Sequence, residues 1–280
     1  MISSRSTGRR PRRFAAAGLV GVVLLVVTGC STQDIPTQLG IPDPVTDSGR
    51  TIWSLWQGTW VALWVVGAFT WALMLGAAVV YRRRRADEIP PQTRYNIPIE
   101  VLYTITPLIV IAVLTFFTWR DEAAITRVSD DQDLTVNVVG YQWNWGFNYV
   151  EDQVYDAGTP TDLATLYLPV DEKVLFELTS PDVIHSFWIP SFLFKMDVVP
   201  GRTNRFEVTP DTEGTFVGRC AEMCGTYHSQ MLFYVKVVPR AEYDAHMAEL
   251  TALGQTGQLE TGRTSDEAQN QGNTRLGGQQ

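Results

Sequence analysis

Long apolar stretches dominate the first 120 positions of the chain. Residues 51–81 contain no charged side chain, and a second stretch, 97–119, contains only Glu100. Each is long enough to cross a bilayer as a helix, and five Trp crowd into the first, as interfacial anchors do. We therefore predict a transmembrane hairpin over 51–120, with spans at about 57–81 and 97–119.

The connection between the two spans begins with four consecutive arginines, Arg82 to Arg85. Positively charged loops stay on the cytoplasmic side of a membrane. The mature N-terminus and everything after Arg120 are therefore expected on the outer, periplasmic or extracellular, side of a bacterial cell membrane.

The first 29 residues have the pattern of a targeting segment. Five Arg precede or flank an apolar core of 14 residues, Phe14 to Val27, which is too short to span a bilayer. The segment ends in Val-Thr-Gly-Cys, which resembles a bacterial lipobox, where the cysteine becomes a lipidated N-terminus. We predict a lipoprotein-type signal peptide at 1–29, cleaved before Cys30, and a polar linker at 30–50; an ordinary signal peptide with an incidental cysteine is the alternative.

After residue 120 the pattern changes to that of strands. Alternating or continuously apolar runs, separated by Pro, Gly and Asp, lie at 134–139, 174–179, 205–209, 214–219 and 231–238. Short runs of this kind predict an all-β sandwich at 121–239. The segment Tyr141–Tyr149 is expected to add one strand, with its odd-numbered aromatic residues on a single buried face.

The chain is expected to end in a helix and a tail. Residues 240–254 show helical spacing, and one face carries the apolar side chains Tyr243, Met247 and Leu250. His246 lies on this helix with no Cys or His nearby, and we expect it to be solvated. Residues 255–280, rich in Gln, Gly and Thr, are predicted to be a disordered tail.

Charge narrows the functions that the chain can have. The whole chain carries a formal net charge of −8, and residues 121–239 have 18 acids against seven bases, a net of −11. This excludes a general nucleic-acid binder, which needs a basic face. It fits a partner with a lysine-rich surface, while solubility is the alternative explanation.

The segment from Cys220 to Met231, CAEMCGTYHSQM, concentrates metal-binding side chains. It includes two thiols, an imidazole and the thioether of Met231, and His185 lies upstream. Sulfur and imidazole ligands together favour copper, and a second cysteine is one more than a single blue copper needs. The set therefore predicts two copper ions bridged by thiolates, each with one terminal His. A disulfide and a zinc site are the alternatives, but Met is not a usual zinc ligand.

This loop resembles the CuA loop of cytochrome c oxidase subunit II, and the similarity covers roughly residues 51–253. It implies a two-helix transmembrane hairpin followed by an all-β cupredoxin domain, a Greek-key barrel or sandwich, with a C-terminal helix. The ligands that it implies for a dinuclear copper centre are His185, Cys220, the carbonyl of Glu222, Cys224, His228 and Met231. The side chain of Glu222 would also bind magnesium at the boundary with subunit I, because carboxylates suit that hard cation.

The resemblance also implies roles in electron and proton transfer. Trp143 matches the tryptophan that receives the electron from the cytochrome, and Glu100 matches the glutamate that opens the K proton pathway of subunit I. Asp182, Glu151 and Asp152 lie where relatives place acids for docking the cytochrome.

Some positions depart from the family pattern. Tyr141 stands where many relatives have His, and Asn148 and Pro181 stand where many have acids. Docking of a freely diffusing basic cytochrome is therefore less well supported than electron transfer itself. A c-type cytochrome held in a supercomplex with the bc complex would need less electrostatic steering.

Together these features predict subunit II of a respiratory cytochrome c oxidase, the electron-input subunit of an oxidoreductase and translocase. Its expected partners are subunit I, subunit III, a c-type cytochrome and membrane lipid, with no nucleic acid. Three other classes fit less well. A quinol oxidase subunit II normally lacks the copper ligands, nitrous oxide reductase needs a large propeller, and a copper chaperone or storage lipoprotein leaves the two spans unexplained.

Overall fold

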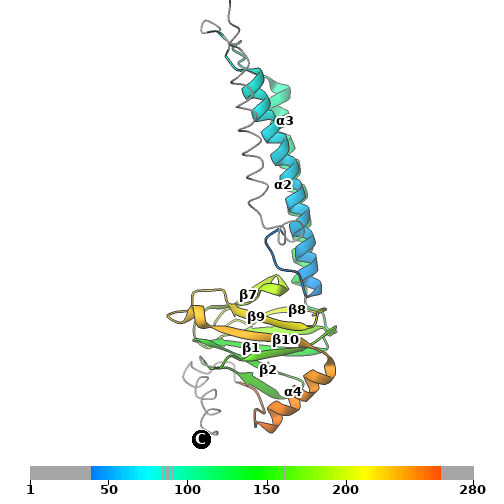
Figure 1. Ribbon diagram of the computed structural model, residues 1–280, viewed down its shortest axis with the longest axis vertical. Helices are drawn as coiled ribbons and strands as arrows, with labels where there is room; N and C mark the ends of the chain where they lie inside the picture. Colours follow the sequence, from blue (N-terminus) through cyan, green and yellow to red (C-terminus); the bar gives the residue numbers. More distant parts are fainter. Residues whose placement is uncertain (1–38, 84, 86–88, 90, 160–161, 260–280) are drawn as a thin grey trace, which may run out of the picture. The chain divides into compact units, whose positions relative to one another are not determined.

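The computed structural model describes residues 39–83, 85, 89, 91–159 and 162–259 (Figure 1). Two long helices come first, α2 at Asp47–Val80 and α3 at Ile97–Ile125, and a β domain with a short helix follows. The predicted signal peptide and Cys30 lie outside the described residues.

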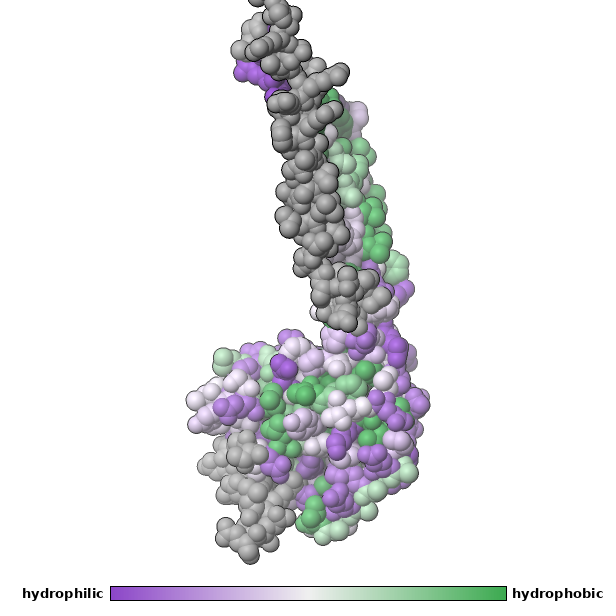
Figure 2. All heavy atoms as spheres, viewed as in Figure 1, coloured by the Kyte–Doolittle hydropathy of each residue, from purple (hydrophilic) through white to green (hydrophobic). Residues whose placement is uncertain are grey.

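Both long helices expose apolar side chains along most of their length (Figure 2). Leu63, Phe69, Leu102 and Phe116 are each more than half exposed. The helices are long and apolar enough to cross a membrane. Apolar surface of this extent is rare on soluble proteins, and it fits a lipid environment.

Side chains at the start of each helix cap it. The Thr46 hydroxyl accepts a hydrogen bond from the Gly49 amide at 3.0 Å. At α3 the Asn96 side chain accepts from the Ile99 amide at 3.4 Å, and Glu100 accepts from the Asn96 amide at 2.9 Å. Such reciprocal bonds satisfy amides that the first helical turn leaves unpaired. In the described residues Glu100 therefore has a structural role at the start of α3.

The β domain consists of two five-stranded sheets. The first has the order β3-β2-β1-β5-β8, and its strands are β1 Leu134–Tyr141, β2 Asn144–Tyr149, β3 Val154–Ala157, β5 Val174–Thr179 and β8 Asn204–Val208. The second has the order β4-β10-β9-β6-β7, and its strands are β4 Thr165–Pro169, β6 His185–Ile189, β7 Phe194–Val198, β9 Gly214–Cys220 and β10 Leu232–Val238. Two 3₁₀ turns, η1 at Pro190–Phe192 and η2 at His228–Gln230, and the helix α4 at Arg240–Ala252 complete the fold. This confirms the predicted two apolar helices, β-sandwich and C-terminal helix.

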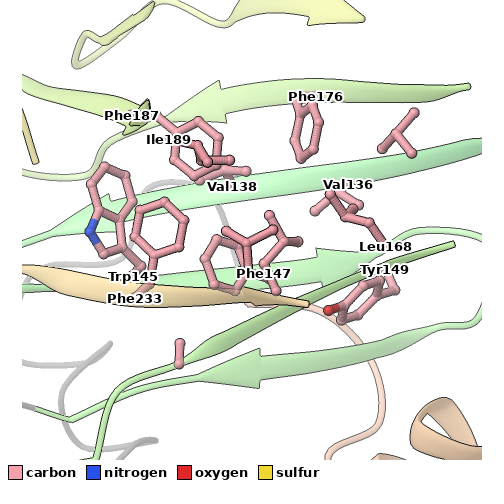
Figure 3. Close-up of a cluster of buried hydrophobic side chains, with 14 of the residues drawn as sticks. Val136, Val138, Trp145, Phe147, Tyr149, Leu168, Phe176, Phe187, Ile189 and Phe233 are labelled. Carbon is pink, nitrogen blue, oxygen red and sulfur yellow. The ribbon is translucent and has the colours of Figure 1, made fainter. Parts of the chain in front are cut away.

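Neighbouring strands are antiparallel except in two pairs, β1 with β5 and β4 with β10. The inner faces of the sheets pack through aromatic and branched side chains (Figure 3). Phe187 of β6 and Phe233 of β10 stack with ring centroids 5.0 Å apart, and Trp145 of β2 meets both rings edge-on. The core is therefore continuous across both sheets.

The segment Tyr141–Tyr149 does not form the single strand that its alternation predicts. β1 ends at Tyr141 and β2 begins at Asn144, and these two residues pair across an antiparallel hairpin. Trp145, Phe147 and Tyr149 enter the main core and Trp143 packs against it partly buried, while Tyr141 packs in a separate cluster on the outer face. The prediction failed because the two-residue turn Gln142–Trp143 contains no Gly, Asn or Asp to mark it.

The helix α4 packs against β3 and β4 and buries the predicted apolar face of Tyr243, Met247 and Leu250. The prediction that His246 is solvated was wrong. Its imidazole stacks on the Tyr167 ring at 3.7 Å between centroids, and Nδ1 lies 3.3 Å from the Glu249 carboxylate. The stacking partner lies on β4, far away in sequence, so the helical pattern gave no sign of it.

The residues after α4 also differ from the expected disordered tail. Gln255–Leu259, which we name the C-terminal strap, pack on the β domain, and both end residues are buried. Tyr155 of β3 donates its amide to the Gln255 carbonyl at 3.0 Å. Hydrogen bonds to an exposed strand edge hold this short polar segment in place. The composition of the segment alone does not reveal these bonds. Residues 260–280 lie outside the described residues.

Candidate metal centre

Strand register brings the predicted ligands to one end of the sandwich. β9 ends at Cys220 beside the beginning of β6, where Phe187 pairs with Cys220, and His185 begins β6. The connection from β9 to β10 leaves and returns at this same end, because the two strands are antiparallel. The β1–β2 turn lies at the corresponding end of the other sheet, and its Gln142 bonds to this connection.

The two cysteines face each other without forming a disulfide. Their Sγ atoms lie 3.9 Å apart, and both thiols are free and almost fully buried. The disulfide alternative therefore does not hold for the described structure. Two sulfurs at this distance can both bind the same metal ion.

The other predicted donors surround these sulfurs. His185 Nδ1 lies 3.9 Å and the Glu222 carbonyl 3.2 Å from Cys220 Sγ. His228 Nδ1 lies 3.5 Å and Met231 Sδ 3.7 Å from Cys224 Sγ. Each sulfur thus has one imidazole and one weaker donor beside it, which is the set that two thiolate-bridged ions would need.

The donors differ in exposure. His185 and Met231 are fully buried, Cys220 and Cys224 nearly so, whereas His228 is half-buried and the Glu222 side chain is exposed. His185 lies against the core, with its ring 6.2 Å from that of Trp145. The Trp145 indole also donates to the Met231 carbonyl at 3.4 Å. The core therefore fixes one side of the site, and His228 lies on the more open side.

The two thiols have opposite tendencies to ionise. Burial raises the pKa of Cys220, but hydrogen bonds from His185 and from the main chain outweigh it and bring that pKa down to about 7. Burial and the neighbouring Cys220 raise the pKa of Cys224 to about 12. One negative charge thus suppresses the second, and two thiolates at this distance need a cation to balance them. The donor set therefore fits a bound metal.

Asp182, which the sequence analysis placed among the docking acids, orients His185 through a hydrogen bond. Asp182 Oδ1 accepts from His185 Nε2 at 2.9 Å, which leaves Nδ1 directed at the sulfurs. Burial raises the pKa of Asp182, but hydrogen bonds from His185 and from the amides of Gln142 and Val183 outweigh it and lower that pKa. The i,i+3 spacing of Asp182 and His185 was the available sequence signal. A carboxylate behind a ligating imidazole is a recurrent feature of metal sites.

Gln142 is a further residue that sequence reasoning missed. Its main-chain amide donates to Asp182 Oδ2 at 2.7 Å, and its side-chain Nε2 donates to the Cys224 carbonyl at 2.6 Å. One residue of the β1–β2 turn thereby holds both ligand-bearing segments.

Trp143, the second residue of this turn, is half-buried over the ligand loop. Its ring meets that of Tyr227 edge-on, with centroids 4.9 Å apart. A Cβ atom at Gly225 would lie 3.0 Å from the indole nitrogen. The tryptophan therefore packs directly on the connection that carries Cys224 and His228.

The predicted docking acids have partners within the domain. The Asp182 side chain is 12% exposed and binds His185. Glu151 accepts from the Thr135 amide at 2.9 Å, and Asp152 accepts from the Tyr243 hydroxyl at 2.7 Å. Of the three, only Glu151 is largely exposed.

The fold and donor set define a β-sandwich domain, preceded by two apolar helices, in which sulfur and imidazole donors lie close enough together that they could hold a metal ion. Residues 134–238 match the family described as cytochrome c oxidase subunit II, periplasmic domain. The probable cytochrome c oxidase subunit 2 of Streptomyces avermitilis is 46% identical, with 91% of this chain and 92% of that protein covered. Cytochrome c oxidase subunit 2 of Mycobacterium tuberculosis is 31% identical, with 88% and 84% covered. This chain belongs to the cytochrome c oxidase subunit II family.

Among solved structures, the periplasmic domain of subunit II of cytochrome oxidase of Bradyrhizobium japonicum is similar. The two sequences are 27% identical, and the match covers 45% of this chain and 98% of the Bradyrhizobium japonicum domain, with a TM-score of 0.42.

Proposed function

We propose that the chain is the electron-input subunit of a respiratory cytochrome c oxidase. In this role it accepts electrons from a c-type cytochrome and passes them to haem a of subunit I, where oxygen is reduced to water and protons are translocated. The observation that carries the proposal is the convergence of two free thiols, two imidazoles and a thioether at one end of the sandwich. Family membership supports it independently.

His185, Cys220, Cys224, His228, Met231 and the Glu222 carbonyl are the residues that would hold a dinuclear copper centre. Thiolate and thioether are soft donors, and imidazole also suits copper. When bound, such a centre would supply one-electron redox chemistry. The chain's own contribution is a rigid frame, because Asp182, Gln142 and Trp145 each fix a ligand-bearing residue through a hydrogen bond.

Trp143 is proposed as the residue nearest to the electron donor. Its ring lies on the ligand connection beside Tyr227, which is 50% exposed. The net charge of −11 over residues 121–239 supports attraction of a basic cytochrome, either soluble or held in a supercomplex. Glu151, Asp152 and Asp182 would contribute to that field.

The side of the site around His228 is proposed to face subunit I. His228 lines a cavity of about 640 Å³ together with Trp188, Arg219 and Leu232. Arg219 lies 5.6 Å from the Trp188 ring centroid. The exposed Glu222 carboxylate would bind magnesium at this boundary, and subunit III would complete the complex.

The membrane assignment is also part of the proposal. The hairpin 51–120 would anchor the chain, with residues 121–239 and the mature N-terminus on the outer side of the membrane. Cleavage after residue 29 would leave Cys30 to be lipidated and 30–50 as a linker. Glu100 would lie near the cytoplasmic end of its span and open the K proton pathway.

The test is metal content together with low-temperature EPR on the full chain, purified in detergent and loaded with copper. Two coppers per chain with a seven-line hyperfine pattern would mean that one unpaired electron is shared by two equivalent nuclei. The control is Met223→Leu, which alters a 74% exposed methionine in the same connection and should leave the spectrum unchanged. A single copper with four lines, or no copper, would refute the dinuclear site.

A further inference from the structure

We propose that the C-terminal strap, Gln255–Leu259, positions the turn Gln142–Trp143, so that this segment after α4 controls how well electrons enter at Trp143. This inference rests on the proposed function, since it assigns a role within the same electron-transfer site. It concerns residues on the outer face of the first sheet, away from the metal donors themselves.

The strap is anchored as an added edge to β3. Tyr155 donates its amide to the Gln255 carbonyl at 3.0 Å, and Gly257 donates its amide to the Gln153 carbonyl at 2.8 Å. Between these two bonds Val154 and Thr256 form an antiparallel bridge. The main chain of the strap is therefore fixed in register with the sheet.

Asn148 of β2 then fixes the last described residue of the strap. Its side-chain nitrogen donates to the Leu259 carbonyl at 3.1 Å, and its side-chain oxygen accepts from the Leu259 amide at 2.7 Å. Asn148 is 1% exposed, so both bonds are shielded from water. The amide side chain of Asn148 offers this donor and acceptor together, whereas an ionised carboxylate only accepts.

Held in this way, the Leu259 side chain lies on Gly146 and beside Tyr141. A Cβ atom at Gly146 would lie 2.3 Å from Leu259 Cδ1 and 3.7 Å from the Tyr141 ring. Leu259, Tyr141, Val139 and Ala157 form one buried cluster outside the main core. The strap thus completes the apolar packing that encloses Tyr141, which is fully buried.

Tyr141 is the residue immediately before the turn. It pairs with Asn144, so its position sets where Gln142 and Trp143 lie. Gln142 bonds to the Cys224 carbonyl, and Trp143 packs on Tyr227. A shift of Tyr141 would therefore move the turn relative to the ligand connection. The ligands have anchors of their own, since Trp145 and Asp182 hold Met231 and His185.

The experiment compares two truncations in the assembled oxidase. One chain ends after Gly254 and lacks the strap, and the matched control ends after Leu259 and keeps it. Copper content, the EPR spectrum, the thermal midpoint, and kcat and KM with a soluble basic cytochrome c are measured for each. We expect loss of the strap to lower kcat/KM on the order of tenfold, as displacement of a reacting group does, with two coppers and the seven-line spectrum retained. The control should match the full chain.

Point variants keep the test decisive if the shorter chain does not assemble. Leu259→Ala and Asn148→Asp should also lower kcat/KM, whereas the conservative variant Leu259→Met should keep most of the kcat/KM of the full chain. A lower thermal midpoint with unchanged kcat/KM would mean that the strap only stabilises the fold, and would overturn the proposal. An equal loss in the control truncation would overturn it as well. Failure of the full chain to bind a copper pair would instead refute the proposed function itself.

Discussion

The two ends of the β-sandwich are built from different residues. At one end the donors His185, Cys220, Cys224 and Met231 point inward from connections and strand ends. At the other end Tyr243 of α4 lies edge-on to Tyr149, with centroids 5.9 Å apart, and donates to Asp152. The first end gathers sulfur and imidazole donors, whereas the second hydrogen-bonds the hydroxyl groups of its buried tyrosines within the domain.

The difference indicates that one end of the sandwich serves metal binding and the other serves stability. At the metal end, ionisation of Cys220 opposes ionisation of Cys224, so two thiolates side by side would need a bound cation to balance their charge. The α4 end buries its aromatic rings with their hydroxyl groups hydrogen-bonded, which is the usual requirement for a stable core. Changes at the metal end should therefore alter redox chemistry more than folding, and changes at the α4 end should do the reverse.

The largest effect is expected from Cys224→Ser. Loss of one bridging sulfur should remove the copper pair, abolish the seven-line EPR pattern and stop electron transfer from the cytochrome. The fold should survive, because the α4 end and the core are unchanged. Copper analysis, EPR and a thermal melt of the detergent-purified chain check this. Retention of two coppers with the same spectrum would contradict the assignment of Cys224.

Tyr243→Ala should have the next largest effect, at the other end. Removing this fully buried ring leaves a cavity beside Tyr149 and should cost roughly 3 kcal/mol of stability. The EPR spectrum of the folded fraction should not change. The matched control is Tyr234→Ala, at a 43% exposed position on β10, where about 0.5 kcal/mol or less is expected. An altered copper spectrum in Tyr243→Ala would show that the two ends are coupled.

Asp182→Asn should weaken the metal end without destroying it. The neutral side chain loses the charge that supports His185, and changes of this kind typically lower metal affinity about 10- to 100-fold. Competition with a copper chelator measures the effect. Asp171→Asn is the control, since Asp171 is exposed and has a φ of 60°, which Asn tolerates. Equal affinities for the two variants would rule out the orienting role of Asp182.

The smallest effect is expected from Tyr243→Phe, which keeps the ring but removes the hydrogen bond to Asp152. A single hydrogen bond contributes about 1 kcal/mol. The thermal midpoint should fall slightly and kcat should not change. If Tyr243→Phe were as destabilising as Tyr243→Ala, the hydrogen bond and not the ring would dominate this end.

The strap also relates to two departures from the family pattern. Tyr141 and Asn148, two positions where the sequence departs from the pattern that the resemblance implies, both contact Leu259. Both residues therefore have a packing role in this domain.

Much of the architecture was predictable from local pattern. The two apolar helices, five of the strands and the buried face of α4 follow from hydrophobic periodicity, because burial and secondary structure share the same repeat. The strands β3, β4, β6 and β7, each four or five residues long, were missed, although β8, with five residues, was predicted. The split at Gln142–Trp143 was missed because the turn lacks the residues that usually mark one.

The sequence by itself determined the ligand types and the apolar segments, since the donors from Cys220 to Met231 lie within one short connection and soft sulfur chemistry does not depend on the fold. Only the tertiary structure decided which distant groups meet: His185 with Cys220, His246 on Tyr167, and Leu259 on Asn148. Each of these contacts joins different strands, turns or helices. Their formation depends on strand register and packing, which no local repeat in the chain encodes.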